Sequence, residues 1–187
     1  LKLILNKYSP LDIEVHKTYK ITKKHIENKP LCLFISYSGN TEETVSALED
    51  AIKADLEWCV ISSGGTLLEM AKENGKPYIE VPSGLQPRAA FGLMTKAVAN
   101  FTPESLEVNV EQNCNDSSFY INELLDNESE NKIIKKAKEI ANNIGNKTVI
   151  IYGGTQLSYL ASQRWKTQIN ENAKSKSYVG YMPEVHH

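Results

Sequence analysis

A continuous apolar run, followed by small residues and then by a helical pattern, most constrains what this chain can fold into. The run Leu31–Ile35 contains no polar residue, which is typical of a strand buried on both faces of a parallel sheet. Ser36, Gly39 and Thr41 lie in the short segment that follows it. Apolar residues then recur at helical spacing over residues 45–52. This strand–loop–helix order predicts a right-handed βαβ crossover and therefore a parallel sheet.

Similar units recur along the chain. Further strands are expected at residues 58–61, 78–81, 148–151 and 178–181. Helices are expected at residues 67–72, after Pro87, at 133–144 and at 156–172. Gly75 is expected to end the first of these helices in a left-handed conformation. Alternating apolar and polar residues at 12–19 also predict an edge strand.

These patterns predict an α/β fold with two similar domains. Each domain is expected to be a doubly wound, mostly parallel sheet flanked by helices. The first domain is assigned to residues 1–101 and the start of a second, incomplete domain to residues 131–187. Residues 102–130 are polar and rich in Asn, Ser and Glu, so they are interpreted as a linker or irregular connection. The chain lacks an initial Met, begins within a helical pattern and stops just after a strand, so we interpret it as a fragment.

Composition excludes several classes of function. The chain has 187 residues, a formal net charge of -2 and scattered Lys and Arg, which argues against a nucleic-acid partner. No apolar run approaches the roughly 20 residues that a membrane span needs. The three cysteines form no C-x-x-C pair, so a reducing cytoplasm is favoured and a zinc site is not expected. His16 and His25 belong to no motif and are expected to be surface residues.

The loop over residues 36–41 has the properties of an anion site. A helix N-terminus carries unpaired N–H groups and partial positive charge. Ser36, Ser38 and Thr41 add three hydroxyls that can donate to phosphate oxygens, and Gly39 allows close backbone approach.

A simpler interpretation of the same loop makes Asn40 a helix cap. Glu43, three residues later, then completes a pair like a capping box. The two interpretations are compatible, but Glu42 and Glu43 suit a bound dianion only if their side chains point away from it.

Residues 36–44, SYSGNTEET, resemble the signature loop of the SIS (sugar isomerase) domain. The residues of this loop most closely resemble those of the bifunctional phosphoglucose/phosphomannose isomerase family. Segments 63–65, 84–90 and 165–174, and Pro183-Glu184 followed by His187, agree with that family in the same order. The resemblance implies interconversion of fructose 6-phosphate with glucose 6-phosphate and mannose 6-phosphate through a cis-enediolate. It also implies a cytoplasmic homodimer that takes a sugar phosphate and needs no cofactor or metal.

The resemblance assigns the chemistry to three residues. Glu171 is implied as the base that moves the proton, Arg88 as the cation that stabilises the enediolate, and His187 as the group that opens the sugar ring. Taken alone, Glu171 and Arg88 also fit ordinary surface residues. Because His186 precedes His187, either residue can be aligned with the family's ring-opening histidine. A histidine pair at the end of a chain is also typical of a purification-tag remnant.

Three other functions remain open at this point. A non-catalytic SIS module that senses sugar phosphates needs the loop but not Glu171, Arg88 or His187. The isomerase half of a glucosamine-phosphate synthase needs a glutaminase domain. A structural paralogue retains the loop for folding alone. Tyr37, Trp58 and Trp165 are interpreted as packing residues rather than sugar-stacking ones, because each lies in or beside an apolar stripe.

Overall fold

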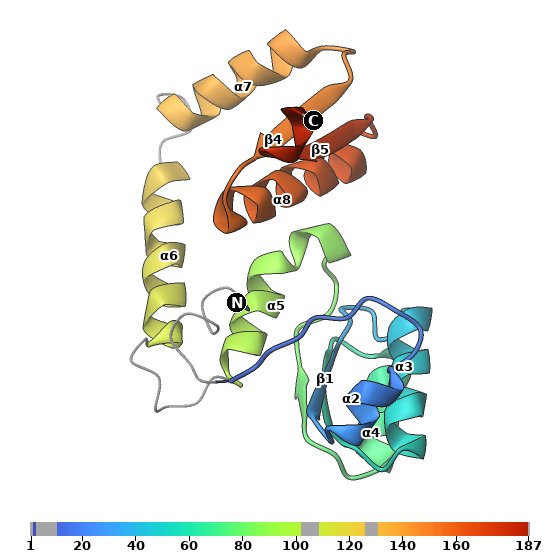
Figure 1. Ribbon diagram of the computed structural model, residues 1–187. Helices are drawn as coiled ribbons and strands as arrows, with labels where there is room; N and C mark the ends of the chain where they lie inside the picture. Colours follow the sequence, from blue (N-terminus) through green and yellow to red (C-terminus); the bar gives the residue numbers. More distant parts are fainter. Residues whose placement is uncertain (1, 3–10, 102–108, 126–130, 187) are drawn as a thin grey trace. The chain divides into compact units, whose positions relative to one another are not determined.

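The computed structural model describes residues 2, 11–101, 109–125 and 131–186 (Figure 1). The chain divides into two compact units, Leu1–Glu111 and Gln112–His187. The expected opening helix lies largely outside the described residues. Within the described ranges, no helix combines the length and the apolar character needed to cross a bilayer.

The first unit is built on a parallel three-stranded sheet in the order β1-β2-β3. The strands are β1 (Leu31–Ile35), β2 (Glu57–Ser62) and β3 (Tyr78–Glu80). Ile35 pairs with Ile61 where β1 and β2 end, so the carboxyl ends of these strands lie side by side. The first unit therefore confirms the predicted parallel α/β arrangement.

Helices cover both faces of this sheet. They are α2 (Lys23–Glu27), α3 (Glu42–Lys53), α4 (Gly65–Glu73) and, after the short helix η1 (Pro87–Ala89), α5 (Phe91–Ala99). The sequential strand order puts α3 and α4 on the same face, as right-handed crossovers require. α5 packs against the opposite face.

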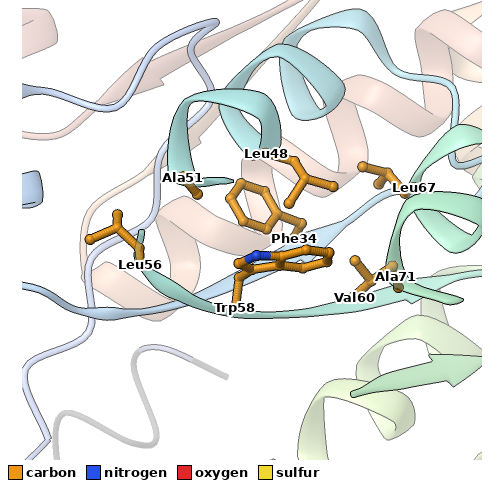
Figure 2. Packing of buried hydrophobic residues seen from close by; sticks show 8 residues of the cluster. All are labelled: Phe34, Leu48, Ala51, Leu56, Trp58, Val60, Leu67 and Ala71. Carbon is orange, nitrogen blue, oxygen red and sulfur yellow. The ribbon is translucent and has the colours of Figure 1, made fainter. Parts of the chain in front are cut away.

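The main core lies between β1, β2 and the pair α3–α4. Figure 2 shows its buried members, which come from the two strands, from the two helices and, for Leu56, from the residue just before β2: Phe34, Leu48, Ala51, Leu56, Trp58, Val60, Leu67 and Ala71. A second cluster, formed by Ile61, Val81 and Ala97, fills the opposite face. Burying large apolar side chains of this kind stabilises the fold by about 1.5–3 kcal/mol each.

The second unit repeats the strand–loop–helix–strand order. It contains α7 (Lys132–Ile144), β4 (Val149–Gly153), α8 (Gln156–Asn172), β5 (Ser177–Tyr181) and the short helix η2 (Glu184–His186). β4 and β5 pair in parallel and α8 packs against both strands. A Cβ at Gly153 would lie only 2.6 Å from Tyr159 Cα, so a glycine is needed where α8 crosses the end of β4.

Two sequence expectations differ from the structure. Residues 12–19 are not a strand, and the apolar positions Val15 and Tyr19 of this segment remain 60% and 50% exposed. The segment 102–130 is not wholly irregular, because Val110–Leu125 forms helix α6. Its polar side chains bond within the helix, as the 2.7 Å Gln112–Asp116 pair does, and so offset their low helix propensity. Residues 102–108 and 126–130 lie outside the described ranges, and the proposed domain limits remain a prediction.

Candidate functional site

The predicted anion loop lies at the carboxyl end of β1 and leads into α3. Ser36 is buried, and its Oγ lies 2.7 Å from Thr41 Oγ1 across the loop. The same Ser36 oxygen accepts a 3.2 Å bond from the Gly39 N–H group. Ser38 is exposed, and its Oγ accepts from the Asn40 N–H group at 3.3 Å. Because a hydroxyl that accepts one bond still carries a hydrogen, Ser38 keeps a donor for a ligand.

The loop is locked to the neighbouring turn that follows β2. The Tyr37 carbonyl accepts from both the N–H group and the hydroxyl of Ser63, at 2.9 and 2.6 Å. The Gly39 carbonyl accepts from the Leu67 N–H group at 3.0 Å. Gly39 has φ +71°, and a Cβ there would lie 1.8 Å from the Gly64 carbonyl oxygen. Only glycine fits this contact, so the loop is held in one shape before any ligand arrives.

Asn40 caps a different helix from the one that the sequence indicated. Its Oδ1 accepts from the Thr66 N–H and hydroxyl groups, at 2.9 and 3.0 Å, in the first turn of α4. The N-cap of α3 is Thr41, whose side chain makes no cap bond. The capping hypothesis is therefore wrong for α3. The first-turn N–H groups of α3 remain suited to an anion.

The acidic residues of the first turn of α3 have a neighbour outside the loop. The carboxylates of Glu43 and Glu42 raise the pKa of the Tyr19 phenol, because each opposes formation of a second negative charge beside it. The Tyr19 phenol, which is protonated at neutral pH like any ordinary tyrosine, can donate to these carboxylates. The two glutamates thus have a hydrogen-bond donor beside them that does not belong to the loop.

Arg88 belongs to the same unit as the loop and is half-buried in η1, directly after Pro87. The segment before it is fixed by Tyr37, whose hydroxyl donates to the Pro82 carbonyl at 3.1 Å and accepts from the Leu85 N–H group at 2.9 Å. Tyr37 thus links the anion loop to the chain that carries Arg88. Sequence reasoning missed this hydrogen-bonding role, because the partners lie more than 40 residues away.

The packing interpretation holds for two of the three aromatic residues. Trp58 is 3% exposed, and Tyr37 packs against the second core cluster. Trp165, in α8, is 54% exposed, so the prediction that it packs in the core is wrong within the described residues.

Glu171 lies in the second unit, in the last turn of α8, and is exposed. The adjacent Asn170 has a structural role: its Oδ1 accepts a 3.1 Å bond from the Ser177 N–H group and lies 2.6 Å from the Ser177 hydroxyl. These bonds hold the end of α8 against the start of β5. The asparagine before Glu171 thus has a role in folding. His187 lies outside the described residues, so its predicted role is not tested.

The structure accordingly brings Ser36, Ser38 and Thr41 together in one loop and places Arg88 in the same unit. Glu171 is described within the other unit. The assignment of catalytic roles to Arg88, Glu171 and His187 remains a prediction. A cluster that the sequence interpretation missed, Glu14 with His16 and His25, lies outside this site.

Comparison with known proteins identifies a family to which the chain is similar. Residues 133–187 match the family described as bacterial phospho-glucose isomerase C-terminal SIS domain. A bifunctional phosphoglucose/phosphomannose isomerase from Aquifex aeolicus is 40% identical over 162 residues, which cover 87% of this chain and 47% of the relative. One of the same name from Thermoplasma acidophilum is 36% identical over 96% of this chain and 54% of its own length.

A solved structure supports the fold. A hypothetical protein from Thermus thermophilus superposes with a TM-score of 0.65 at 15% identity, covering 88% of this chain and 45% of that one. The family match identifies residues 133–187 as part of a sugar isomerase (SIS) domain. More narrowly, the chain belongs to the bifunctional phosphoglucose/phosphomannose isomerase family. It spans about half the length of the curated relatives that it matches.

Proposed function

We propose that this chain supplies the phosphate-binding loop and part of the catalytic machinery of an aldose–ketose isomerase. The substrate pair is fructose 6-phosphate with glucose 6-phosphate or mannose 6-phosphate. The observation that carries the proposal is the Ser36–Thr41 hydroxyl pair, 2.7 Å apart at the start of α3, in a member of this family. The loop offers hydroxyl and backbone donors together, which is the combination that a phosphate dianion requires.

The reaction needs a proton to move between C1 and C2. In the proposed sequence His187 assists ring opening by transferring a proton to the ring oxygen. Glu171 then removes the proton from one carbon and returns it to the other. Arg88 stabilises the negative oxygen of the cis-enediolate between these steps, because its guanidinium group is positively charged and can donate hydrogen bonds to that oxygen. The proposed steps are proton transfers and require no cofactor.

The proposal extends to the assembly and its location. We place the protein in the cytoplasm, as a homodimer that takes a small sugar phosphate. The whole protein's activity, including its preference between glucose and mannose substrates, is part of the same proposal.

A second candidate reaction has a specific observation in its favour. A protein named D-glucosamine-6-phosphate 4-epimerase, from Sulfolobus acidocaldarius, is 29% identical over 95% of this chain and 55% of its own length. A 4-epimerase would also bind its substrate by the 6-phosphate group, but the reacting carbon would be C4 instead of C1 and C2. The non-catalytic sensor is the further alternative, in which the sugar phosphate binds but is not converted.

A coupled turnover assay separates these functions. In the whole protein that contains these residues, fructose 6-phosphate should be converted to both glucose 6-phosphate and mannose 6-phosphate. Glu171→Gln should lower kcat by at least about 100-fold, because a general base contributes about 10²–10⁴-fold. Binding without turnover would favour the sensor, and turnover of glucosamine 6-phosphate alone would favour the epimerase. Near-normal kcat in Glu171→Gln would overturn the assignment of the base.

A further inference from the structure

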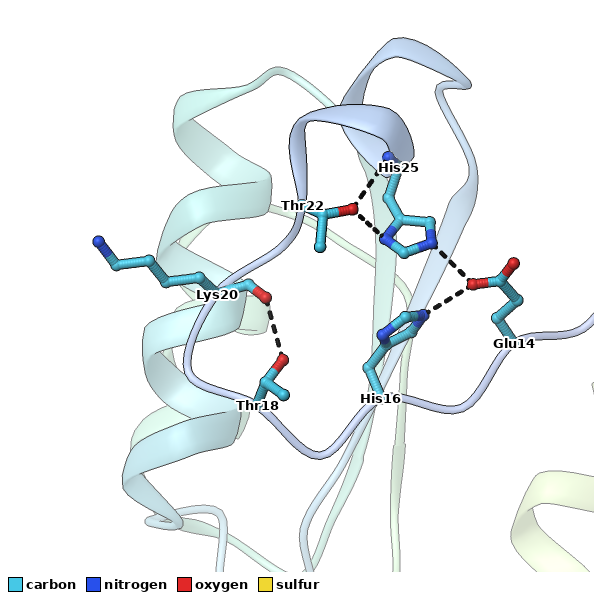
Figure 3. A network of polar contacts seen from close by, with 6 residues as sticks. All are labelled: Glu14, His16, Thr18, Lys20, Thr22 and His25. Atoms are coloured by element: carbon cyan, nitrogen blue, oxygen red, sulfur yellow. Dashed lines mark hydrogen bonds and ion pairs between the residues drawn. The ribbon is translucent and has the colours of Figure 1, made fainter.

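Three potential metal-binding side chains meet in the first unit, away from the anion loop. Figure 3 shows Glu14 and His16, from the segment before α2, together with His25 of α2. Glu14 Oε2 lies 3.1 Å from His16 Nε2 and 2.7 Å from His25 Nε2. The three potential ligand atoms all lie within 4.8 Å of one another. Their positions therefore converge on one small volume.

We propose that Glu14, His16 and His25 bind one divalent transition-metal ion of the zinc class. Two imidazoles and one carboxylate are a ligand set that zinc accepts, with bonds of about 2.0–2.2 Å. Tetrahedral bonds of that length separate neighbouring ligand atoms by about 3.4 Å. The side chains of the present cluster need only small rotations to reach this spacing. The fourth position is left for water.

The cluster has an outer partner that orients one ligand. Thr22 Oγ1 lies 2.6 Å from His25 Nδ1, and Thr22 is also the N-cap residue of α2. With a metal on Nε2, the single proton of neutral His25 sits on Nδ1, where the Thr22 oxygen accepts it. Metal-bound histidines commonly donate their second N–H group in this way, which fixes the tautomer and the ring direction.

The ligand atoms of the cluster select the kind of ion. Glu14 is its one carboxylate, and the same short segment contains four lysines: Lys17, Lys20, Lys23 and Lys24. Mg²⁺ and Ca²⁺ are hard cations that need several oxygen ligands, and the single carboxylate of this cluster does not supply them. Zinc-class ions form directional bonds to imidazole nitrogen, and the two histidines provide them.

Binding would link two parts of the chain that the backbone leaves loosely connected. Glu14 and His16 lie on an extended segment that belongs to no sheet, whereas His25 lies on a helix joined through residues 28–30 to β1. A shared ion would hold the segment against α2. The site does not depend on the proposed isomerase function, and its failure would leave that proposal untouched.

The test is a zinc titration of the 187-residue chain, prepared without an added tag and stripped with EDTA. Isothermal titration calorimetry should detect one Zn²⁺ per cluster, and Co²⁺ should give the visible absorption of a low-coordinate complex. The chain has four histidines, so His186→Ala with His187→Ala is the matched control. This control should keep the zinc site, whereas His16→Ala with His25→Ala should weaken zinc binding more than tenfold.

Two milder variants keep the test valid if the double variant misfolds. Glu14→Gln removes the charged ligand. Thr22→Val removes the outer hydroxyl, which also caps α2, and should weaken zinc binding about 10-fold. Zinc affinity that is unchanged in the His16–His25 pair, or lost in the C-terminal pair, would overturn the proposal. So would equal binding of Mg²⁺ or Ca²⁺, or no zinc binding by the folded chain.

Discussion

Gly39 is the residue on which the shape of the candidate site depends most directly. Its N–H group bonds to Ser36 Oγ and its carbonyl accepts from Leu67, so it joins the anion loop to the start of α4. The sequence indicated a glycine for close approach of a ligand. In the structure the close approach is to the backbone of Gly64, and the benefit to a ligand is indirect, through a rigid loop.

Replacing Gly39 by alanine should therefore destabilise the fold more than replacement of a comparable glycine. Gly75 is the matched control: its φ is +60°, but a Cβ there meets no atom within 4 Å. Both variants bear the strain of a left-handed alanine, about 1–2 kcal/mol. Gly39→Ala should lose about 1–3 kcal/mol more, because its Cβ overlaps the Gly64 carbonyl. Urea midpoints measure the difference, and equal losses in the two variants would contradict the packing account.

The core cysteines should be slow nucleophiles. Burial raises the pKa of the Cys32 thiol, and burial together with the nearby Cys32 raises that of Cys59. A raised pKa lowers the thiolate fraction at any fixed pH, and the thiolate is the reactive form. Iodoacetamide at pH 8 should modify both more slowly in the folded chain than in urea. Mass spectrometry follows each site, and equal rates in the two conditions would be inconsistent with burial.

At the scale of elements, the helices that follow the strands differ in how their N-termini are capped. The N-terminus of α8 is satisfied by its own capping box, in which Thr155 and Ser158 bond reciprocally. The N-terminus of α4 is capped by Asn40 from the adjacent loop. The N-cap Thr41 of α3 has no such side-chain bond and instead lies beside Ser36. Among these three helices, α3 is therefore the one best suited to an anionic ligand.

Much of this element order follows from local pattern. The bounds of β1 and α8, and the left-handed Gly75, were predictable because apolar periodicity and turn chemistry are local signals. The failed strand at residues 12–19 shows the limit: alternation indicates an extended chain, but only a partner makes a sheet. The Tyr37 bridge and the Glu14–His25 contact span 45 and 11 residues respectively, and no local pattern reports such pairs.

Tyr37→Phe should loosen the segment before Arg88 while leaving the core packed. The variant keeps the ring against the second cluster but removes the hydroxyl between Pro82 and Leu85. We expect a loss of about 1–2 kcal/mol and faster amide exchange at Leu85. Tyr78→Phe is the control, since that ring is 43% exposed on β3. Identical exchange at Leu85 in both variants would refute the bridging role.

At the scale of the whole chain, two compact units each contain a parallel sheet with packed helices. The chain spans about half of its relatives' length, so the complete catalytic arrangement remains a proposal. Sequence reasoning identified the family from ordered motifs. Its assignment of Glu171 and His187 to catalysis stays a prediction, and the neighbouring Asn170 has a folding role that no local pattern indicated.

The two units should respond separately to a core mutation. Leu48 is fully buried in the first unit, and Leu48→Ala should destabilise it by about 2–5 kcal/mol. Amide exchange should accelerate in β1, β2 and α3 but change little in β4 and α8. Leu157→Ala, at a position that is 72% exposed in α8, is the control and should have little effect in either unit. Equal acceleration in β4 and α8 would mean that the chain unfolds as one cooperative body.

The central claim is that the loop over residues 36–41 binds the substrate phosphate. The most direct test is to compare, by equilibrium titration, the affinity for fructose 6-phosphate with the affinity for fructose. The loop over residues 36–41 should bind the phosphorylated sugar and leave fructose without measurable affinity. Ser38→Ala should weaken binding about 10-fold or more, because a hydrogen bond to a charged group contributes about 1.5–3 kcal/mol. Ser118→Ala, at an exposed serine of α6, should have no effect. Equal affinity for the two sugars, or unchanged affinity in Ser38→Ala, would contradict the assignment of this loop as the phosphate site.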